Sequence, residues 1–383
     1  MKQNKRIFSI CYYDVVAGDT NRKIALSSVN KLNYIFSALN RSGYSVDVIS
    51  PSYYTGASLK FVLGKKISIG QGNTLRLFSS FGGIKRLTAI SKIWTLFQMF
   101  IYLLFYVKKD SQVLVYHSPA YTNILLWIKR IKRCELVGEI EEIYQNVSKM
   151  TKRQCNLELK FINACDKYIF PTILLDKYVN KQGKPSAIIH GTYSVPDKQE
   201  KKIFVDDKIH VVYAGTLNIL KGGAAAAISS ALYLSDQYHI HILGAGSDEE
   251  IHNINNLISK VTRTGYAKVT YEGLLSGEEF DRFLQSCHIG LSTQDPSAAF
   301  NSTSYPSKIL TYMGNGLTVV SVRIPAIELS SVSSDLSYYD VQTPGNIADA
   351  IINVDFSDSF ERNRLKIKSL DKEFMEDLKK LLS

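Results

Sequence analysis

Hydrophobic and polar positions divide the second half of the chain into short apolar runs and longer helical stretches. Five runs have the length and composition of buried strands: 210–215, 238–244, 268–273, 288–293 and 317–322. The stretches that separate them have helical spacing: 223–234, 248–261, 277–286 and 306–313. Strands that alternate with helices of this length predict βαβ units, and therefore a parallel sheet with both faces covered by helices.

The first half of the chain repeats this plan less regularly. The predicted strands are 6–13, 44–50, 112–118, 135–140, 167–171 and 186–191. The predicted helices lie near 23–41, 84–107, 119–132, 153–164 and 173–181. The stretch 56–83 is rich in glycine and serine, so we expect a hairpin or loop inserted between the units.

The pattern as a whole predicts an α/β protein with two doubly wound, Rossmann-like domains. We expect residues 1–195 to form the first domain and 205–357 the second. The join around 191–208 is polar, and its apolar residues follow neither the spacing of a helix nor that of a strand. Residues 358–383 form a charged helical pattern with one apolar stripe. We expect this C-terminal helix to return to the N-terminal domain.

Composition supports a folded protein of about two domains. The 383 residues are 45% hydrophobic and 21% charged, and the 23 glycines follow no period, which excludes collagen, coiled coil and disorder. The five cysteines form no CxxC pair, so we expect reduced thiols in a cytoplasmic protein: Cys11, Cys134, Cys155, Cys165 and Cys287. The short, interrupted apolar stretch at the N-terminus predicts a first strand and not a signal peptide.

Positive charge is concentrated in the first half of the chain. Residues 1–200 hold 29 Lys and Arg against 13 Asp and Glu, and 201–383 hold 17 against 22. Such a field favours an anionic partner, either nucleic acid or a membrane surface. No nucleic-acid-binding motif accompanies the charge, so we expect no nucleic-acid partner.

The segment 93–107 is apolar at almost every position and has basic residues on both sides. Its fifteen residues are fewer than the ~20 that a spanning helix needs. Two interpretations stay open: a buried helix of the first domain, or a helix whose aromatic side rests on the inner face of the plasma membrane.

Candidate chemistry lies at the ends of the predicted strands, because ligands of open α/β sheets bind at the carboxyl edge. Gly215 and Lys221 follow one strand of the second half, and Gly244 and Gly246 follow the next. A third segment, 301–316, offers Lys308 and the hydroxyls of Ser302, Thr303, Ser304 and Ser307. Two cations and two helix N-termini at one edge favour a diphosphate. A solvated lysine and an ordinary helix cap are the alternatives.

The first half offers fewer signals. The segment 18–23 begins a helix after strand one, His117 ends a strand, and Glu139, Glu141 and Glu142 follow another strand. A structural histidine and a solvated acidic turn are the alternatives. His239 and His241 share one strand face, but a third ligand is not apparent in the sequence, so we expect no metal site.

Four segments in order resemble family four of the retaining glycosyltransferases: YAGTLNILKG, HILGAG, the run 269–293 and YPSKILTYMGNGLTVVS. The resemblance covers nearly all of 205–325 and is looser in the N-terminal half. It implies the GT-B fold, in which two Rossmann-like domains face each other across a cleft. It also implies transfer of a sugar from a nucleotide donor with retention of configuration, and no bound metal or other cofactor.

The resemblance assigns roles by position. Lys221 and the loop Ser304–Lys308 would hold the donor diphosphate, His117 would contact the transferred sugar, and Glu139 or Glu142 would face the acceptor. The full donor set that it implies is Gly18, Gly215, Thr216, Lys221, Gly244, Gly246, Glu272, Leu274, Leu275, Ser304, Tyr305, Ser307, Lys308 and Thr311. The acceptor would be a lipid-linked glycan in surface polysaccharide synthesis.

Two features depart from that family. Thr216 stands where arginine is frequent, and Thr303 and Thr311 stand where many members have glutamates. Two further hypotheses therefore stay open: a catalytically inactive nucleotide-sugar-binding or scaffold subunit, and a sugar-nucleotide epimerase.

Overall fold

The structure is a computed structural model that describes residues 5–15, 21–24, 26–147, 150–200, 203–218, 222–297 and 303–383. The chain forms two compact units. Unit 1 comprises Met1–Pro171, Leu175–Ile189 and Phe374–Ser383, and unit 2 comprises Thr172–Leu174 and His190–Glu373.

Unit 1 is built on an eight-stranded sheet with the order β10-β9-β8-β7-β1-β2-β5-β4. Its strands are β1 (Lys5–Ile10), β2 (Tyr44–Ser50), β4 (Lys65–Ser68), β5 (Thr74–Leu77), β7 (Gln112–Tyr116), β8 (Glu135–Glu139), β9 (Lys167–Phe170) and β10 (Ser186–Ile188). All neighbours pair in parallel except β4 with β5. The predicted insertion 56–83 thus supplies two strands of the main sheet, and β3 (Lys60–Val62) pairs separately with β6 (Ser80–Gly82).

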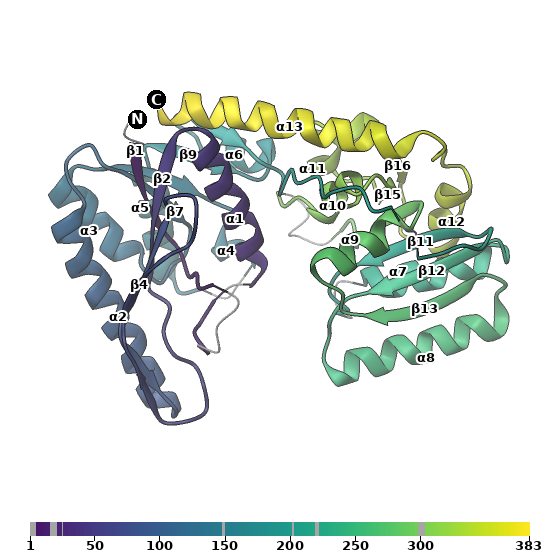
Figure 1. Ribbon diagram of the computed structural model, residues 1–383, viewed down its shortest axis with the longest axis horizontal. Coiled ribbons are helices and arrows are strands. Elements are labelled where there is room, and N and C mark those ends of the chain that lie inside the picture. The colour runs from purple at the N-terminus through teal and green to yellow at the C-terminus, as the bar shows by residue number, and fades with distance from the viewer. Residues whose placement is uncertain are drawn as a thin grey trace. The chain divides into compact units, whose positions relative to one another are not determined.

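Helices cover both faces of this sheet. The helices of unit 1 are α1 (Leu26–Arg41), α2 (Lys85–Tyr106), α3 (Thr122–Lys132), α4 (Tyr144–Val147), α5 (Lys152–Ala164) and α6 (Ile173–Val179), whose first residues belong to unit 2. Figure 1 shows α1 on one side of the sheet and α2 and α3 on the other. The central strands are buried on both faces, as the continuous apolar runs predict.

Helix α2 contains the segment 93–107 whose role the sequence left open. Of its 22 residues, a single stripe is buried: Ser91, Thr95, Met99 and Leu103. The four positions recur every fourth residue, so one narrow face packs on the unit 1 core and most of the apolar side chains stay outside it. Among the described residues, α2 is the one helix long and apolar enough to cross a membrane by length and composition.

Unit 2 contains a six-stranded, all-parallel sheet with the order β13-β12-β11-β14-β15-β16. Its strands are β11 (Ile209–Ala214), β12 (Tyr238–Leu243), β13 (Lys268–Gly273), β14 (Ile289–Ser292), β15 (Thr318–Val322) and β16 (Leu336–Tyr339). The chain runs outward from β11 to β13 and returns to β14 beside β11. The order of the strands therefore reverses between β11 and β14, which is where doubly wound sheets bind ligands.

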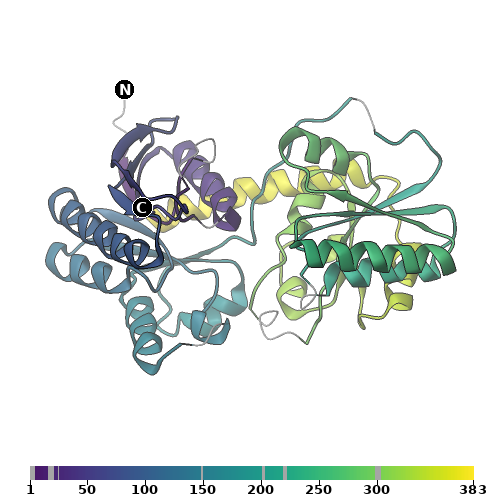
Figure 2. The same cartoon turned by 90° about the horizontal axis from the view of Figure 1, so that it is seen from below.

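The helices of unit 2 follow the strands as predicted, with two additions. They are α7 (Gly223–Ser230), α8 (Asp248–Thr264), α9 (Gly277–Gln285), α10 (Lys308–Gly314), α11 (Pro325–Glu328), α12 (Pro344–Ile352) and α13 (Ser359–Leu382). Helices lie on both sides of the sheet, with α8 along β13 (Figures 1 and 2). The sequence pattern did not predict β16 or α12, which close this end of the sheet.

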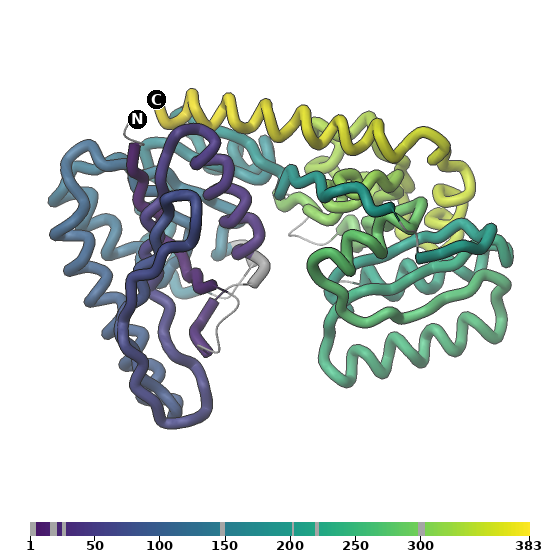
Figure 3. The backbone as a smooth tube through the Cα atoms, viewed as in Figure 1, coloured from purple at the N-terminus to yellow at the C-terminus, as the bar shows by residue number. Residues whose placement is uncertain are grey.

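Helix α13 contributes to both units. Near its start, the side-chain amide of Asn363 donates to the carbonyl of Leu317 at 2.7 Å. Near its end, Phe374 stacks on Tyr34 of α1, and the carbonyl of Leu382 accepts from Tyr44 and Gln112. The last ten residues accordingly belong to unit 1, and Figure 3 traces this yellow segment to the C-terminus.

Gly244, directly after β12, allows the closest backbone approach in unit 2. Its φ is +149°, and a Cβ atom there would lie 1.8 Å from the carbonyl oxygen of Gly215. We predict that Gly244→Ala lowers the free energy of unfolding by about 2–4 kcal/mol, because the clash adds to backbone strain. Thermal unfolding measures the effect.

Gly277→Ala is the matched control for this prediction. Gly277 also has a positive φ (+57°), but a Cβ atom there meets nothing within 4 Å. The control isolates the cost of the left-handed conformation, about 1–2 kcal/mol. Equal losses in the two variants would show that the contact with Gly215 is not a constraint.

Candidate functional site

A pocket of about 650 Å³ lies in unit 2, at the carboxyl ends of β11, β12 and β14. It is thus found at the reversal of strand order, where the helices on either side of β11 and β14 diverge. Its lining comprises Tyr213, Ala214, Gly215, Thr216, Gly223, Leu243, Gly244, Ala245, Leu274, Leu275, Phe280, Thr293, Gln294, Ser304, Tyr305, Pro306, Ser307, Lys308, Thr311 and Tyr312.

The backbone of two glycines, Gly215 after β11 and Gly244 after β12, forms part of the pocket lining. The N–H of Gly215 donates to the carbonyl of Leu243 at 3.0 Å, and that of Gly244 donates to Gly273 at 2.9 Å. These bonds extend the ladder past the ends of β11 and β12. The absence of a Cβ atom at Gly215 leaves its backbone open to the pocket, whereas at Gly244 the corresponding space is filled by the carbonyl of Gly215.

Lys308 is the one charged side chain among the described residues of the lining. Its Nζ lies 3.9 Å from the centroid of the Tyr213 ring. A Cβ atom on Gly215 would lie 2.8 Å from the same Nζ. The ammonium group of Lys308, at the start of α10, therefore lies beside the end of β11. Lys308 therefore contributes a positive charge to the described lining of the pocket.

Tyr213 and Tyr312 fix the position of Lys308. The hydroxyl of Tyr312 accepts from the N–H of Ala214 at 2.7 Å and holds α10 against β11. Burial raises the pKa of Tyr213 to about 12, so this ring stays neutral beneath the ammonium group. Sequence reasoning missed both tyrosines, and their places in an apolar run and a helix gave no signal of a pocket.

The structure brings together most of the donor residues that the family resemblance implied. The lining contains Gly215, Thr216, Gly244, Leu274, Leu275, Ser304, Tyr305, Ser307, Lys308 and Thr311. Gly18, Lys221 and Ser302 lie outside the described residues. Gly246 and Glu272 are not among the lining residues, because Gly246 packs against Leu217 and Glu250 and the Glu272 carboxylate contacts His241.

Thr303 and Thr311 occupy different positions. Thr311 lines the pocket, whereas the carbonyl of Thr303 accepts from the hydroxyl of Thr172 at 2.7 Å. Polar contacts with a ligand on this side would come from hydroxyl and amide groups such as those of Thr311 and Gln294, which also lines the pocket.

The three candidate catalytic residues of unit 1, His117, Glu139 and Glu142, lie at or just after the ends of β7 and β8. His117 is buried, stacks on Phe161 at 5.7 Å, and has its Nε2 3.6 Å from a Glu158 oxygen. Burial lowers the pKa of His117 to about 4, so the imidazole is neutral at pH 7. Glu142 is half-buried.

Glu139 is fully buried, and its carboxyl oxygens have no hydrogen-bond partner among the described residues. Desolvation raises its pKa to about 8, against the attraction of Lys31, which pairs with the neighbouring Glu141. A neutral carboxylic acid at the end of β8 is a candidate proton donor or acceptor.

Comparison with known proteins gives matches in structure alone. No family model and no curated protein sequence matches the chain. Sucrose-phosphate synthase from Thermosynechococcus elongatus matches with a TM-score of 0.68 at 13% identity, over 98% of each chain. The chain has the GT-B fold.

Further solved structures agree. A trehalose-6-phosphate protein from E. coli, bound with UDP-2-fluoro glucose, matches with a TM-score of 0.61 at 12% identity over 99% of each chain. The Anabaena protein HepE, in complex with UDP and glucose, matches with a TM-score of 0.62 at 11% identity, over 98% of this chain and 96% of that one. At these identities the likeness shows the GT-B fold, in agreement with the sequence prediction.

The raised pKa of Glu139 makes a prediction about stability. The folded state holds this proton up to about pH 8, and an ordinary glutamate loses it near pH 4.5, so stability falls as the pH rises between these values. We predict that Glu139→Gln removes this loss and is more stable than the wild type at pH 8, by on the order of 3 kcal/mol.

Calorimetric unfolding of both proteins at about pH 5 and pH 8 measures the difference. Glu135→Gln, at the start of the same strand and partly exposed, is the control. A gap between wild type and Glu139→Gln that does not change with pH would contradict the assignment.

Proposed function

We propose that the chain is a retaining glycosyltransferase that transfers a sugar from a nucleoside diphosphate sugar bound in the unit 2 pocket. The observation that carries the proposal is the ammonium group of Lys308, the one charged group of the described lining, beside the glycine-lined ends of β11 and β12. A diphosphate needs cations and close approach of backbone, and both are present at this edge.

The dimensions and polarity of the pocket suit such a donor. About 650 Å³ lies within the ~300–1,000 Å³ typical of small-molecule sites. Tyr305, Leu274 and Leu275 offer apolar surface for a base or sugar, and Thr311, Ser304 and Ser307 offer hydroxyls. Two structural neighbours are described as bound to UDP or a UDP-sugar analogue, so UDP is the natural first probe.

Charge stabilisation is the chemical task of this site. When the bond from the sugar to the donor diphosphate breaks, negative charge grows on the departing oxygen. Lys308, fixed by Tyr213, offers a preorganised positive charge to that oxygen. Lys221, a second predicted cation, belongs to the same proposal.

Retention is supported by the mechanism named for one structural neighbour. The study of a trehalose-6-phosphate synthase with a TM-score of 0.64 and 12% identity, over 99% of each chain, concerns glycosyl transfer with retention. We propose attack by an acceptor hydroxyl on the face that the diphosphate leaves. We further propose that His117 of unit 1 contacts the transferred sugar and that Glu139 or Glu142 faces the acceptor.

The surface of α2 favours a lipid-linked glycan as acceptor, with the protein acting at the cytoplasmic side of a membrane. The exposed large apolar side chains of this helix are Ile90, Ile93, Trp94, Phe97, Ile101, Phe105 and Tyr106. Trp127 and Ile131 of the neighbouring α3 are also exposed. An apolar face of this size on a folded protein marks an interaction site.

Basic residues surround that apolar face. Lys85 and Arg86 precede it and Lys108 and Lys109 follow it, all of them exposed. An apolar face with a basic border is typical of helices that lie in an anionic lipid interface. The competing acceptor is a soluble sugar phosphate, because two structural neighbours are a sucrose-phosphate synthase and a trehalose-6-phosphate synthase, whose names describe sugar phosphates as products.

We predict that Lys308→Ala weakens binding of UDP by roughly 10- to 100-fold, the equivalent of one charge-assisted contact worth about 1.5–3 kcal/mol. Isothermal titration calorimetry measures the dissociation constant. The matched control is Lys260→Ala on α8, where the lysine is exposed and does not line the pocket. Unchanged affinity in Lys308→Ala, or equal loss in both variants, would refute the donor site.

The membrane proposal predicts that the protein sediments with vesicles that contain anionic lipid and that Phe97→Ser/Phe105→Ser reduces the bound fraction at least several-fold. The loss follows from two exposed phenyl groups that no longer enter the interface. Val205→Ser/Tyr266→Ser, at exposed positions of unit 2, is the control. A wild type that stays in the supernatant would contradict the membrane proposal and favour a soluble acceptor.

A further inference from the structure

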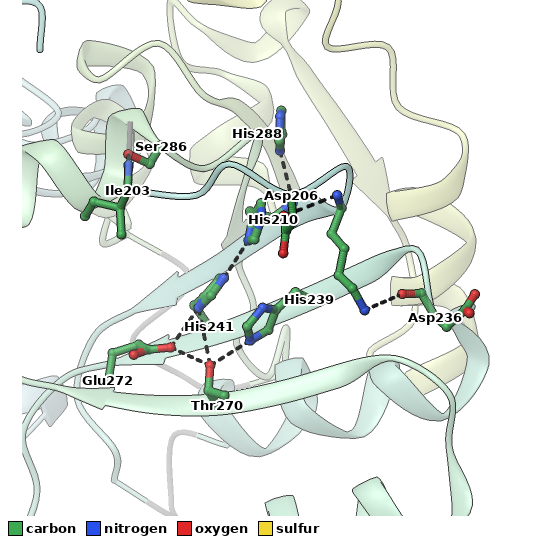
Figure 4. A network of polar contacts seen from close by, with 11 residues as sticks. Ile203, Asp206, His210, Asp236, His239, His241, Thr270, Glu272, Ser286 and His288 are labelled. Atoms are coloured by element: carbon green, nitrogen blue, oxygen red, sulfur yellow. Dashed lines mark hydrogen bonds and ion pairs between the residues drawn. The ribbon is translucent and has the colours of Figure 1, made fainter. Parts of the chain in front are cut away.

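Three buried imidazoles meet on one face of the unit 2 sheet. His210 comes from β11, and His239 and His241 come from β12, where alternate residues share a face. The parallel register pairs His210 with His239, and each of the three histidines is at most 6% exposed. One ring nitrogen of each histidine lies within 4.8 Å of a ring nitrogen of the other two. Figure 4 shows the three rings and the polar contacts around them.

An oxygen atom orients each ring from outside. The Nε2 of His210 lies 2.7 Å from Asp206, the Nδ1 of His241 lies 2.8 Å from Glu272, and the Nε2 of His239 lies 2.9 Å from the hydroxyl of Thr270. Metal-binding histidines show this arrangement, in which a carboxylate or hydroxyl fixes the ring and its second nitrogen faces the ion.

The hydrogen bonds of this network require one more proton than its groups supply. Asp206, His210, His241 and Glu272 meet in a row through three contacts of 2.7–2.8 Å, because the Nδ1 of His210 also lies 2.8 Å from the Nε2 of His241. Each contact needs a proton. Two neutral imidazoles supply two protons and two ionised carboxylates supply none.

An extra proton or a metal ion would fill the deficit, and the geometry of the cluster favours the metal. A proton between His210 and His241 needs no third ligand, yet a ring nitrogen of His239 also lies within 4.8 Å of both.

We propose that His210, His239 and His241 bind a divalent transition-metal ion, with Zn²⁺ as the best match to three imidazole ligands. Three histidines and one further ligand complete the tetrahedral shell that Zn²⁺ adopts. Asp206 and Glu272 have partly exposed side chains, and they offer the ion a route from solvent.

The site would be structural and would support the pocket from behind. Glu272 is the penultimate residue of β13 and lies two residues before Leu274, which with Leu275 lines the pocket. An ion that joins β11 and β12, with Glu272 held on His241, fixes the start of this loop. The ion lies outside the pocket lining and has no part in sugar transfer.

The full-length protein, treated with a chelator and dialysed, tests the proposal by titration with Zn²⁺ and with Co²⁺. We expect one equivalent of either ion per chain, a rise in the temperature of unfolding, and visible ligand-field absorption from Co²⁺ in a four-coordinate site. His239→Gln should weaken the affinity for Zn²⁺ at least tenfold. His252→Gln, an exposed histidine of α8, should leave it unchanged.

Circular dichroism and metal-free unfolding establish that each variant is folded. Absence of stoichiometric metal in the wild type would overturn the proposal and leave an extra proton in the network. Wild-type affinity in a folded His239→Gln variant would also overturn it, because the ion would then be bound elsewhere. Neither result bears on UDP binding at Lys308, so the two proposals fail separately.

Discussion

The reversal of strand order between β11 and β14 is the constraint on which the rest of unit 2 depends. A parallel sheet covered on both faces buries its strands, so a soluble organic ligand reaches the sheet only at the strand ends. At the reversal, neighbouring connections leave in opposite directions and open a space between them. The pocket occupies this space, and α10 delivers Lys308 to it.

Close backbone packing at this edge determines how the pocket is built. Gly244 lies against the carbonyl of Gly215, and Lys308 extends over Gly215 and the ring of Tyr213. A side chain at Gly215 would meet the ammonium group of Lys308, and one at Gly244 would meet the carbonyl of Gly215. The glycine backbone and the ammonium group of Lys308 are therefore the two features of this edge that suit an anionic ligand.

The sequence predicted the strands and helices of unit 2 because their apolar runs are continuous and their spacing is regular. It did not predict β16, a short and half-buried edge strand, or α12, which packs beside it. It predicted the residues that follow strands, such as Gly215 and Gly244, since position at a strand end is readable from pattern. The sequence did not indicate Tyr213 and Tyr312 as pocket residues. Their place in the lining depends on how α10 packs against β11, which the sequence pattern does not show.

Contacts across strands were also beyond the sequence. His239 and His241 share a strand face by simple alternation, but His210 joins them only through the parallel register of β11 and β12. Glu272, near the end of β13, has the position of a pocket residue in the sequence pattern. Its carboxylate instead contacts His241 of the neighbouring strand β12 and accepts from the hydroxyl of Thr270 on its own strand.

Amide hydrogen exchange with and without saturating UDP tests the central claim most directly, that the edge of the unit 2 sheet holds the nucleotide. The account predicts slower exchange in residues 213–217, 243–245 and 304–311, which contribute to the lining, and unchanged exchange in α8. Protection confined to other segments, or none at these three while UDP is bound, would contradict it.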